Sequence, residues 1–463
     1  MKAVIMAGGQ GTRIRSVASD IPKPMIPVMG KPVLKYQIEN LVGSGIRDII
    51  LVTGYLSSCI TEYFGDGKKF GADISYFNES VPMGTAGALY YLKDRLQDDD
   101  FLLIMGDLML SVDFKRFMAA HKQSGSAVTL FVHPNSHPQD SDIILTDREY
   151  DLSDYYEDKC GRENQSFKGV KAPKSLKVTG FIGKKDERKG YYHNQVNAGI
   201  YAISPLVLKA IPEPEGRKVD LDKDIIRPLT GEGKVSAYRS TEYVKDMGTP
   251  ERYEEVSHAV QTGLVEDRNL SNKQKCVFID RDGTLNREKG FISAPEDIEL
   301  YEGAAEAIAK LNKSRYLCVL ITNQPVVARG ETDLKGLDEI QKCIELKLGE
   351  EGAYLDGAYF CPHHPDSGFD GEVRELKFRC FCRKPEPGLI LKAAEDLNID
   401  LSGSYMIGDS TGDMLCGKRA GVRTIGLKTG MALKDGKYDA AADEICSSLL
   451  EAAELILSRE QEV

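Results

Sequence analysis

The sequence has no long apolar run, no dense set of cysteines and no excess of positive charge, and each absence excludes a class of protein. Its apolar stretches, such as residues 316–321, are far shorter than the roughly 20 residues that cross a bilayer. The 10 cysteines among 463 residues are too few and too irregular for a secreted disulfide scaffold. Because 60 Lys and Arg face 71 Asp and Glu, the net charge of -11 argues against nucleic acid as a partner.

The first residues also lack the features of a targeting segment. Residues 1–9 hold one lysine and an apolar run that is too short for a signal peptide. Together with the expectation of reduced thiols, this predicts a cytoplasmic protein without a membrane anchor. The composition, 41% hydrophobic and 28% charged, is that of an ordinary globular protein, and the length predicts two or three domains.

Short β-rich runs alternate with amphipathic helical patterns along both halves of the chain. In the first half we expect strands at 2–7, 48–53, 74–77 and 100–107, and helices at 31–42 and 85–95. In the second half we expect strands at 276–280, 317–323, 405–409 and 423–427, and helices near 303–313, 333–349, 387–397 and 411–420. This alternation predicts two α/β domains, each with a parallel sheet covered on both faces.

Two polar segments interrupt this pattern. Residues 262–275 are polar and weakly periodic, which predicts an exposed connection between the domains. We therefore divide the chain into a first domain at 1–262, a linker at 263–274 and a second domain at 275–463. Residues 134–176 are rich in Pro, Asp and Ser and predict an insertion of loops and short strands, whose role the sequence does not reveal.

The first candidate site begins at a glycine-rich turn after the first strand. Four residues there place backbone N–H groups where a nucleoside triphosphate can approach: Gly8, Gly9, Gly11 and Thr12. Alone, such a loop is equally a tight turn without a ligand. Arg13 and Lys23 add cations that can neutralise a pyrophosphate leaving group. Asp107 and Asp246, each at a strand end, can bind one Mg²⁺ from the carboxyl edge of a sheet, although Asp107 alone is equally a strand cap.

Six ordered motifs make residues 1–260 resemble the sugar-phosphate nucleotidyltransferases. They are GGQGTR at 8–13, KPMIPVMGKP at 23–32, MGTAGAL at 83–89, GD at 106–107, NAGIY at 197–201 and KDMGTPERY at 245–253. The resemblance implies a Rossmann-like fold in which a sugar 1-phosphate attacks the α-phosphate of a nucleoside triphosphate and releases pyrophosphate. It places Gly84, Thr85 and Gly87 near the base, and Asn197 and Gly199 near the sugar.

One position departs from this family. Where the family commonly has a Glu-Lys pair before the NAG motif, this chain has Gly183 and Lys184. A contact of Lys184 with the sugar therefore stays open against a solvated surface charge.

The second candidate site begins at residues 278–286, FIDRDGTLN. Asp280 and Asp282 follow an apolar strand, so one carboxylate can attack phosphorus while the other serves as acid and base. Three motifs follow: ITNQ at 321–324, RKP at 383–385 and GDS at 408–410. Taken singly, Asp282 could equally be a turn former, Lys384 a surface charge and Asp409 a strand cap.

In this order the four motifs resemble those of the haloacid dehalogenase-type phosphatases. The resemblance implies a second Rossmann-like domain with Asp280 as nucleophile, Asp282 as general acid and base, and Lys384 offsetting their charge. It implies Mg²⁺ at Asp280, Asp409 and the backbone of Asp282, with Asp413 outside the ligand set. Two residues at the end of the second strand would bind the phosphoryl oxygens: Thr322 and Asn323.

Two cysteine clusters stand beside the RKP motif. Cys361, His363, Cys380 and Cys382 make a donor set suited to structural zinc, against the alternatives of buried thiols or a catalytic cysteine. With this loop, residues 275–430 closely resemble the heptose 1,7-bisphosphate phosphatases. The histidinol-phosphate phosphatases have a similar loop. One departure is PVVARG at 325–330 in place of the usual SGIARG.

The two halves predict consecutive reactions, because a phosphatase that leaves a sugar 1-phosphate precedes a transferase that uses one. We expect removal of the 7-phosphate of heptose 1,7-bisphosphate and formation of an NDP-heptose. A resemblance to heptose 1-phosphate guanylyltransferases favours GTP. Arg329 and Arg383 are the cations expected to bind the distal 1-phosphate, unless Arg329 pairs with an acid and Arg383 orders the zinc loop.

Two alternatives stay open. One is a mannose or glucose 1-phosphate transferase joined to a phosphatase of other specificity. The other is a regulatory protein in which one half only senses a sugar nucleotide. The expected partners are small sugar phosphates and nucleotides, without nucleic acid or membrane. The sequence leaves the oligomeric state open.

Overall fold

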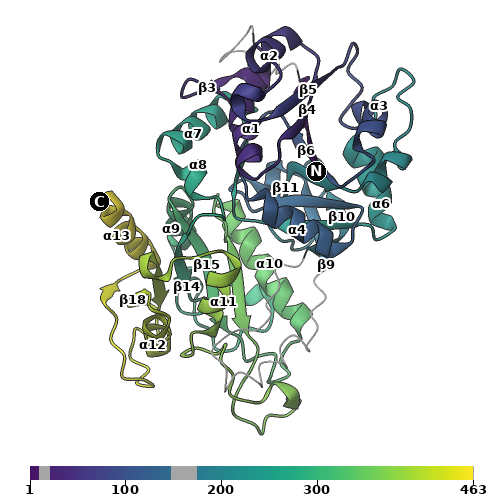
Figure 1. The fold of residues 1–463 in the computed structure, drawn as a ribbon. Coiled ribbons are helices and arrows are strands. Elements are labelled where there is room, and N and C mark those ends of the chain that lie inside the picture. The colour runs from purple at the N-terminus through teal and green to yellow at the C-terminus, as the bar shows by residue number, and fades with distance from the viewer. Residues whose placement is uncertain (10–20, 148–174, 462–463) are drawn as a thin grey trace.

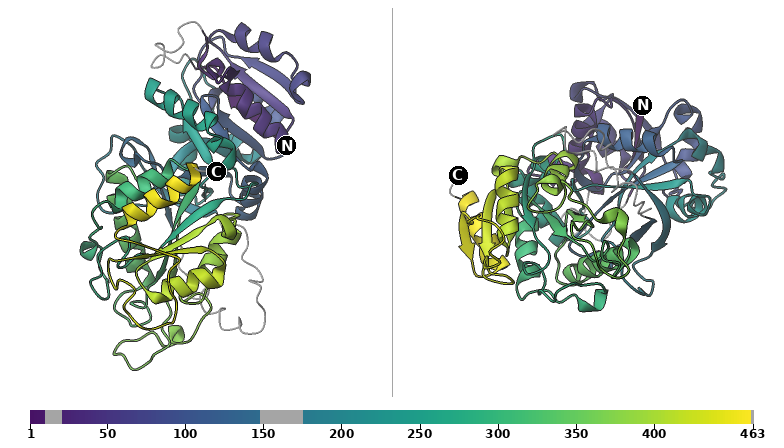
Figure 2. Two further views of the ribbon diagram at one scale, coloured as in Figure 1. Left: turned by 90° about the vertical axis from the view of Figure 1, so that its left-hand side faces the viewer. Right: turned by 90° about the horizontal axis from the view of Figure 1, so that it is seen from below.

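The computed structural model describes residues 1–9, 21–147 and 175–461. Figures 1 and 2 show two α/β bodies stacked end to end, the N-terminal half coloured purple to teal and the C-terminal half green to yellow. The prediction of an α/β architecture in two parts is confirmed. None of the helices in the described part of the chain combines the length and apolarity that a bilayer crossing requires.

The first body is built on a sheet ordered β5-β4-β1-β6-β11-β8-β12-β10-β9. Its strands are β1 (Lys2–Met6), β4 (Asp48–Thr53), β5 (Asp73–Asn78), β6 (Phe101–Met105), β8 (Val128–His133), β9 (Ile143–Asp147), β10 (Leu176–Ile182), β11 (Val196–Ile203) and β12 (Val235–Arg239). The strands from β5 to β6 are parallel, as predicted. The expectation of a wholly parallel sheet is wrong, because β11 runs antiparallel to β6 and β8, and antiparallel neighbours need no crossover helix.

Helices and two short ribbons complete this body. The helices are α1 (Val33–Gly43), α2 (Ser57–Phe64), α3 (Gly87–Leu96), α4 (Phe114–Ser124), α6 (Arg227–Gly231) and α7 (Pro250–Gln261). The ribbons pair β2 (Pro27–Val28) with β3 (Lys31–Pro32), and β7 (Leu108–Ser111) with β13 (Tyr243–Asp246). Alternate residues of β1 enter two cores: Ile5 packs with Leu34 of α1, and Val4 with Leu89 of α3. Both sheet faces are thus covered, which explains the continuous apolar runs of the sequence.

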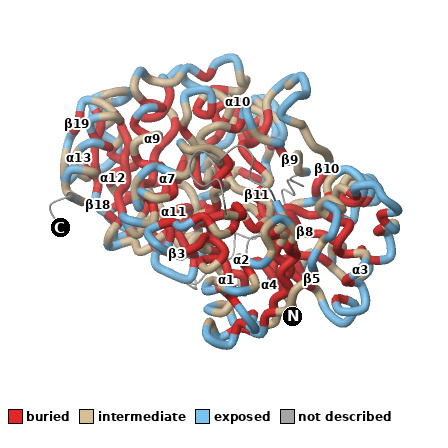
Figure 3. Tube along the Cα trace, turned by 90° about the horizontal axis from the view of Figure 1, so that it is seen from above, coloured by how far each residue is buried: buried red, intermediate tan, exposed pale blue. Residues whose placement is uncertain are grey.

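The second body has a parallel sheet ordered β16-β15-β14-β17-β18-β19. Its strands are β14 (Lys275–Ile279), β15 (Tyr316–Asn323), β16 (Gly357–Cys361), β17 (Tyr405–Gly408), β18 (Arg423–Leu427) and β19 (Glu444–Cys446). Its helices are α9 (Ala304–Asn312), α10 (Leu334–Glu350), α11 (Gly388–Asp396), α12 (Thr411–Ala420) and α13 (Leu449–Gln461). The strands and helices predicted for this half are confirmed. Figure 3 shows buried segments running through the middle of both bodies, with exposed loops around them.

The connection between the bodies is only partly exposed, so the expectation of an exposed segment at residues 262–275 holds for residues such as 271–273 and not for the buried ones. It contains α8 (Leu264–Asp267), and Arg268 and Gln274 are only 4% and 1% exposed. The Gln274 amide donates hydrogen bonds to three backbone carbonyls of the same segment. Polar side chains here satisfy buried backbone groups, which is why polarity does not signal exposure. The division at 262 and 275 stays a prediction.

The two bodies also touch directly through α10. The His193 ring lies between two carboxylates of that helix, 2.9 Å from Asp338 and 3.2 Å from Glu345. The backbone N–H of Asn194 donates to the second carboxylate oxygen of Glu345 at 2.9 Å. These buried polar contacts fix how the two sheets face each other.

Glu242 holds the connection against the first body. Its carboxylate accepts hydrogen bonds from the backbone N–H groups of Asp113 (2.6 Å) and Leu270 (3.1 Å) and from the hydroxyl of Ser240 (2.8 Å). Burial raises the pKa of Glu242 to about 7, because the cost of desolvating the charged form exceeds what these hydrogen bonds return.

We predict that Glu242→Gln removes a pH-dependent loss of stability. A raised folded-state pKa means that the unfolded chain releases the proton first, so stability falls as pH rises from about 4.5 to about 7. The glutamine keeps one oxygen acceptor and can donate to Ser240. Near pH 8 the variant should be more stable by up to about 3 kcal/mol, and near pH 4 equally stable, in urea unfolding. A variant less stable at both pH values would contradict this.

Candidate active sites and a candidate metal centre

Three buried carboxylates meet at the carboxyl edge of the second sheet. Asp280 follows β14, Asp409 follows the neighbouring strand β17, and Asp413 lies in the first turn of α12. One oxygen of each lies within 4.8 Å of the others. An all-oxygen set is what Mg²⁺ prefers. The sequence interpretation left Asp413 outside the ligand set, whereas the structure places it inside this group.

One buried lysine balances part of this charge. The Lys384 ammonium contacts Asp280, lies 2.6 Å from Asp413 and donates to the carbonyl of Ile321 at 3.1 Å. Burial, and then the charge of Asp413, raise the pKa of Asp280 well above its ordinary value. Burial raises the pKa of Asp409 to about 7. One ammonium does not offset three buried carboxylates, so the site fits a divalent cation.

Asp282 faces a different set of partners. Its carboxylate accepts hydrogen bonds from Arg281 (2.9 Å), Asn286 (3.0 Å) and Gln324 (2.9 Å). Burial opposes ionisation, but Arg281 and these hydrogen bonds outweigh it and lower the pKa of Asp282. Gln324 also donates to the hydroxyl of Thr322 at 2.8 Å. Sequence reasoning missed Gln324, although it stands in the ITNQ motif next to two residues that were chosen.

The remaining residues expected near the substrate have protein partners. The Asn323 amide exchanges two hydrogen bonds with the backbone of Lys384, at 3.0 and 3.1 Å. Arg329 pairs with Glu331 at 2.7 Å and lies between the rings of two phenylalanines, Phe291 and Phe369. Arg383 donates to the carbonyl of His363 at 3.0 Å. Both arginines thus make the structural contacts that the sequence left open as alternatives, and their contact with a phosphate stays a prediction.

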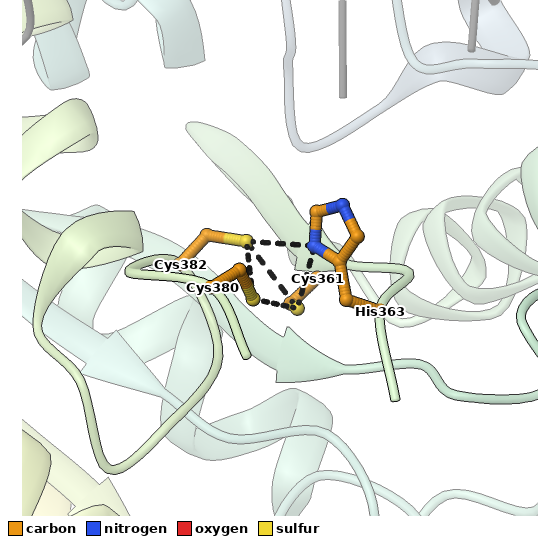
Figure 4. Close-up of side chains that lie close together, drawn as sticks. All are labelled: Cys361, His363, Cys380 and Cys382. Carbon is orange, nitrogen blue, oxygen red and sulfur yellow. Dashed lines mark hydrogen bonds between the residues drawn. The ribbon is translucent and has the colours of Figure 1, made fainter. Parts of the chain in front are cut away.

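The four residues of the cysteine and histidine cluster point toward one another (Figure 4). They are Cys361, His363, Cys380 and Cys382; five of the six distances among their sulfur and Nδ1 atoms are 3.2–3.5 Å, and all four atoms lie within 4.8 Å of one another. A tetrahedron with such edges has its centre about 2.1 Å from each corner, near the roughly 2.0 Å and 2.3 Å of Zn–N and Zn–S bonds. The four residues therefore fit a closed zinc site.

The first site is assembled from strand ends of the first body. Gly8 and Gly9 follow β1, while Gly11, Thr12 and Arg13 lie outside the described residues. The Lys23 ammonium contacts the carboxylate of Asp107. Asp246 ends β13 opposite Leu108, so the β7–β13 ribbon brings Asp246 beside Asp107. The carbonyl of Asp107 also accepts the N–H of Met247 at 3.2 Å.

The loop before α3 is held against the segment after residue 218. Gly84 has a φ of +87°, and a side chain there would meet the carbonyl oxygen of Val219 at 2.4 Å. The Thr85 hydroxyl accepts the N–H of Leu221 at 2.8 Å, and Gly87 begins α3. The loop therefore has the tight backbone that the sequence predicts, whereas its contact with a base stays a prediction.

A cavity of about 780 Å³ gathers most of the expected sugar-phosphate residues. Its lining includes Asp107, Lys184, Asn197, Gly199 and Asp246. A bulge in β11 shapes one wall, where the N–H of Gly199 donates to the side chain of Asn197 at 3.0 Å. The backbone N–H of Lys184 donates a hydrogen bond to the carboxylate of Asp142 at 2.9 Å, which holds the backbone at this position. The structure thus brings five of the predicted residues around one space.

Comparison with known families agrees with this geometry. Residues 2–263 match the nucleotidyl transferase family, and residues 381–452 match the HAD-hydrolase-like family. The chain belongs to the nucleotidyl transferase family. As a member of this family, it carries the predicted fold in its first half.

Curated relatives match as well. A protein of Haemophilus ducreyi is 38% identical over 180 residues, which are 38% of this chain and 96% of that protein. One of Escherichia coli K12 is 34% identical over 193 residues, 42% of this chain and 98% of that protein. Both are named D-glycero-beta-D-manno-heptose-1,7-bisphosphate 7-phosphatase. The chain therefore belongs to this phosphatase family too.

Two solved structures are similar to parts of the chain. HddC from Yersinia pseudotuberculosis, complexed with GMP-PN, is 24% identical, covers 56% of this chain and 99% of its own, and has a TM-score of 0.44. The D,D-heptose 1,7-bisphosphate phosphatase from B. bronchiseptica, complexed with magnesium and phosphate, is 31% identical, covers 40% and 99%, and has a TM-score of 0.35.

Proposed function

We propose that this chain is a bifunctional enzyme of nucleotide-activated heptose synthesis. It removes the 7-phosphate of D-glycero-D-manno-heptose 1,7-bisphosphate and transfers a nucleotidyl group, from GTP, to heptose 1-phosphate. The observation that carries the proposal is membership of one chain in both families, because the product of the named phosphatases is an acceptor for a nucleotidyl transferase. A sensing protein with one inactive half is disfavoured, since the charged groups of phosphoryl transfer lie together in the second half.

In the phosphatase half, Asp280 attacks the phosphorus of the 7-phosphate and the bond to the sugar oxygen breaks, leaving an aspartyl-phosphate. Asp282 gives its proton to the leaving oxygen and then takes one from the water that releases phosphate. The approaching phosphate dianion raises the pKa of Asp282, which favours the protonated form in the first step. Gln324 and Arg281 orient this carboxylate. Asp280, Asp409 and Asp413 are the residues that would hold Mg²⁺, whose charge would offset the repulsion between these carboxylates and the substrate.

In the transferase half, a phosphate oxygen of the sugar 1-phosphate attacks the α-phosphorus and pyrophosphate leaves. Lys23 stabilises charge on the transferred and leaving groups, and the N–H groups of Gly8 and Gly9 face the triphosphate. Asp107 and Asp246 are the residues that would hold Mg²⁺, which lowers the repulsion between the two phosphates. The contact between the Lys23 ammonium and the Asp107 carboxylate supports this proposal, because it puts the lysine next to a residue that would hold Mg²⁺.

We also propose structural zinc at the four-residue cluster. Purified chain should carry about one zinc, and Cys380→Ser should lose it and lower the stability of the phosphatase half. Cys59→Ser is the control, because Cys59 lies in α2 of the other body. Elemental analysis and urea unfolding measure both effects. Active wild-type protein without zinc would contradict the proposal.

The two activities should be separable by single substitutions. Asp280→Asn removes the nucleophile and should abolish phosphate release while pyrophosphate release continues. Lys23→Ala should do the reverse and lower nucleotidyl transfer by about 100- to 1,000-fold. Each variant is the control for the other, in parallel assays of phosphate and pyrophosphate. Loss of both activities in either folded variant would mean that the two reactions share a site.

Arg383 distinguishes substrate binding from loop ordering. If its guanidinium binds the distal 1-phosphate, Arg383→Ala should lower kcat/KM for the bisphosphate. The loss of transition-state stabilisation calculated from this decrease should be about 2–4 kcal/mol. The same variant should cleave histidinol phosphate, a poor substrate without a second phosphate, at the wild-type rate. If kcat/KM falls by the same factor for both substrates, Arg383 acts only through its hydrogen bond to the carbonyl of His363.

A further inference from the structure

The cavity that gathers the expected sugar-phosphate residues of the first body is also lined by residues of the second body. Besides Asp107 and Asp246, its lining includes Asn312 and Lys313 at the end of α9, and Tyr354 in the loop before β16. Arg315, three residues after α9, pairs with Asp267 at the end of α8 of the connection at 2.9 Å. The pocket expected to bind the phosphatase product is therefore built from both halves of the chain.

Several hydrogen bonds fix the wall that the second body contributes. The Asn312 amide exchanges two 3.0 Å hydrogen bonds with the backbone of Tyr354. Arg268 donates to the carbonyl of Ser314 at 3.1 Å, and Arg315 donates to the carbonyl of Thr262 at 3.1 Å. Residues on both sides of Lys313 are thus tied to neighbouring segments, so the position of its backbone is set by the contact between the bodies.

The cavity has a cluster of cations at this end. Lys245 pairs with Glu255, and Arg252 pairs with Asp246 at 2.5 Å. Burial, and then the nearby charges of Arg252 and Lys313, lower the pKa of Lys245. In the described part of the chain, Lys313 has no carboxylate within ion-pair distance. Its side chain is exposed, so its ammonium is available to an anion that enters the cavity.

We propose that Lys313 of the phosphatase half binds the phosphate of the sugar 1-phosphate in the transferase pocket. The inference rests on the proposed function and adds a binding residue from the other half. An ammonium on a flexible stem suits a phosphate dianion, and Lys245 already carries a partner. Because Lys313 follows α9 of the second body, whereas Lys23, Asp107 and Asp246 belong to the first, it acts on binding of the acceptor rather than on the attack at phosphorus.

The test compares full-length variants in the transferase assay with heptose 1-phosphate. Lys313→Ala should raise the KM for the sugar phosphate by about 10-fold, and Lys313→Glu should raise it further. Lys313→Arg should stay near wild type. The kcat, the KM for GTP and the phosphatase activity should not change, and retained phosphatase activity shows that the second body is folded.

Lys310→Ala is the matched control. Lys310 lies one turn earlier on α9 and pairs with Glu306 (3.1 Å) and Glu454 (2.6 Å), and it does not line the cavity. Its KM should equal that of wild type. An unchanged KM in Lys313→Ala and Lys313→Glu would overturn the proposal.

A binding measurement separates this inference from the proposed function. If wild type forms no nucleotide sugar from heptose 1-phosphate, calorimetry of the full chain with heptose, mannose and glucose 1-phosphates still tests it. If Lys313→Ala binds the same sugar phosphate more weakly than wild type does, Lys313 is supported as a ligand contact. Equal affinity, or no binding of any of the three by wild type, overturns it.

Discussion

The position of the connection on the second body depends on one buried ion pair, between Arg268 of the connection and Asp356 of the second body. Their side chains are 5% and 1% exposed, and the guanidinium lies 3.2 Å from the carboxylate. Asp356 also accepts the N–H of Cys318 in β15 at 2.8 Å, while Arg268 donates to the carbonyl of Tyr316 at 2.9 Å. A buried charge without its partner costs about 3–5 kcal/mol, so this pair locks the connection onto the second sheet. The shared wall of the cavity follows from that lock.

Both reactions use the same architectural device. In parallel sheets the carboxyl ends of neighbouring strands meet at one edge, and the sequence places its acidic residues there. Asp280 and Asp409 stand at such an edge in the second body, and Asp107 follows β6 in the first. The difference lies in the compensation of charge. Lys23 faces one carboxylate, whereas Lys384 faces two and leaves a surplus that suits a divalent cation.

Sequence reasoning succeeded where a local pattern decides the structure. The strands before Asp280 and Asp409 are short apolar runs that end in polar residues, and the four zinc-type donors stand in two close pairs. It failed where the structure depends on contacts between residues that are distant in sequence. The antiparallel direction of β11 and the burial of Gln274 depend on neighbours that no local window contains. The role of Lys313 in the cavity wall required both bodies to be placed together.

The central claim is that one chain carries out two consecutive reactions on one sugar. Phosphorus NMR of wild-type protein with heptose 1,7-bisphosphate, GTP and Mg²⁺ tests it most directly. The account predicts that phosphate appears first, and that pyrophosphate and a new diphosphate-linked sugar then appear in equal amounts. Release of phosphate with no pyrophosphate from GTP or any other nucleoside triphosphate would contradict it.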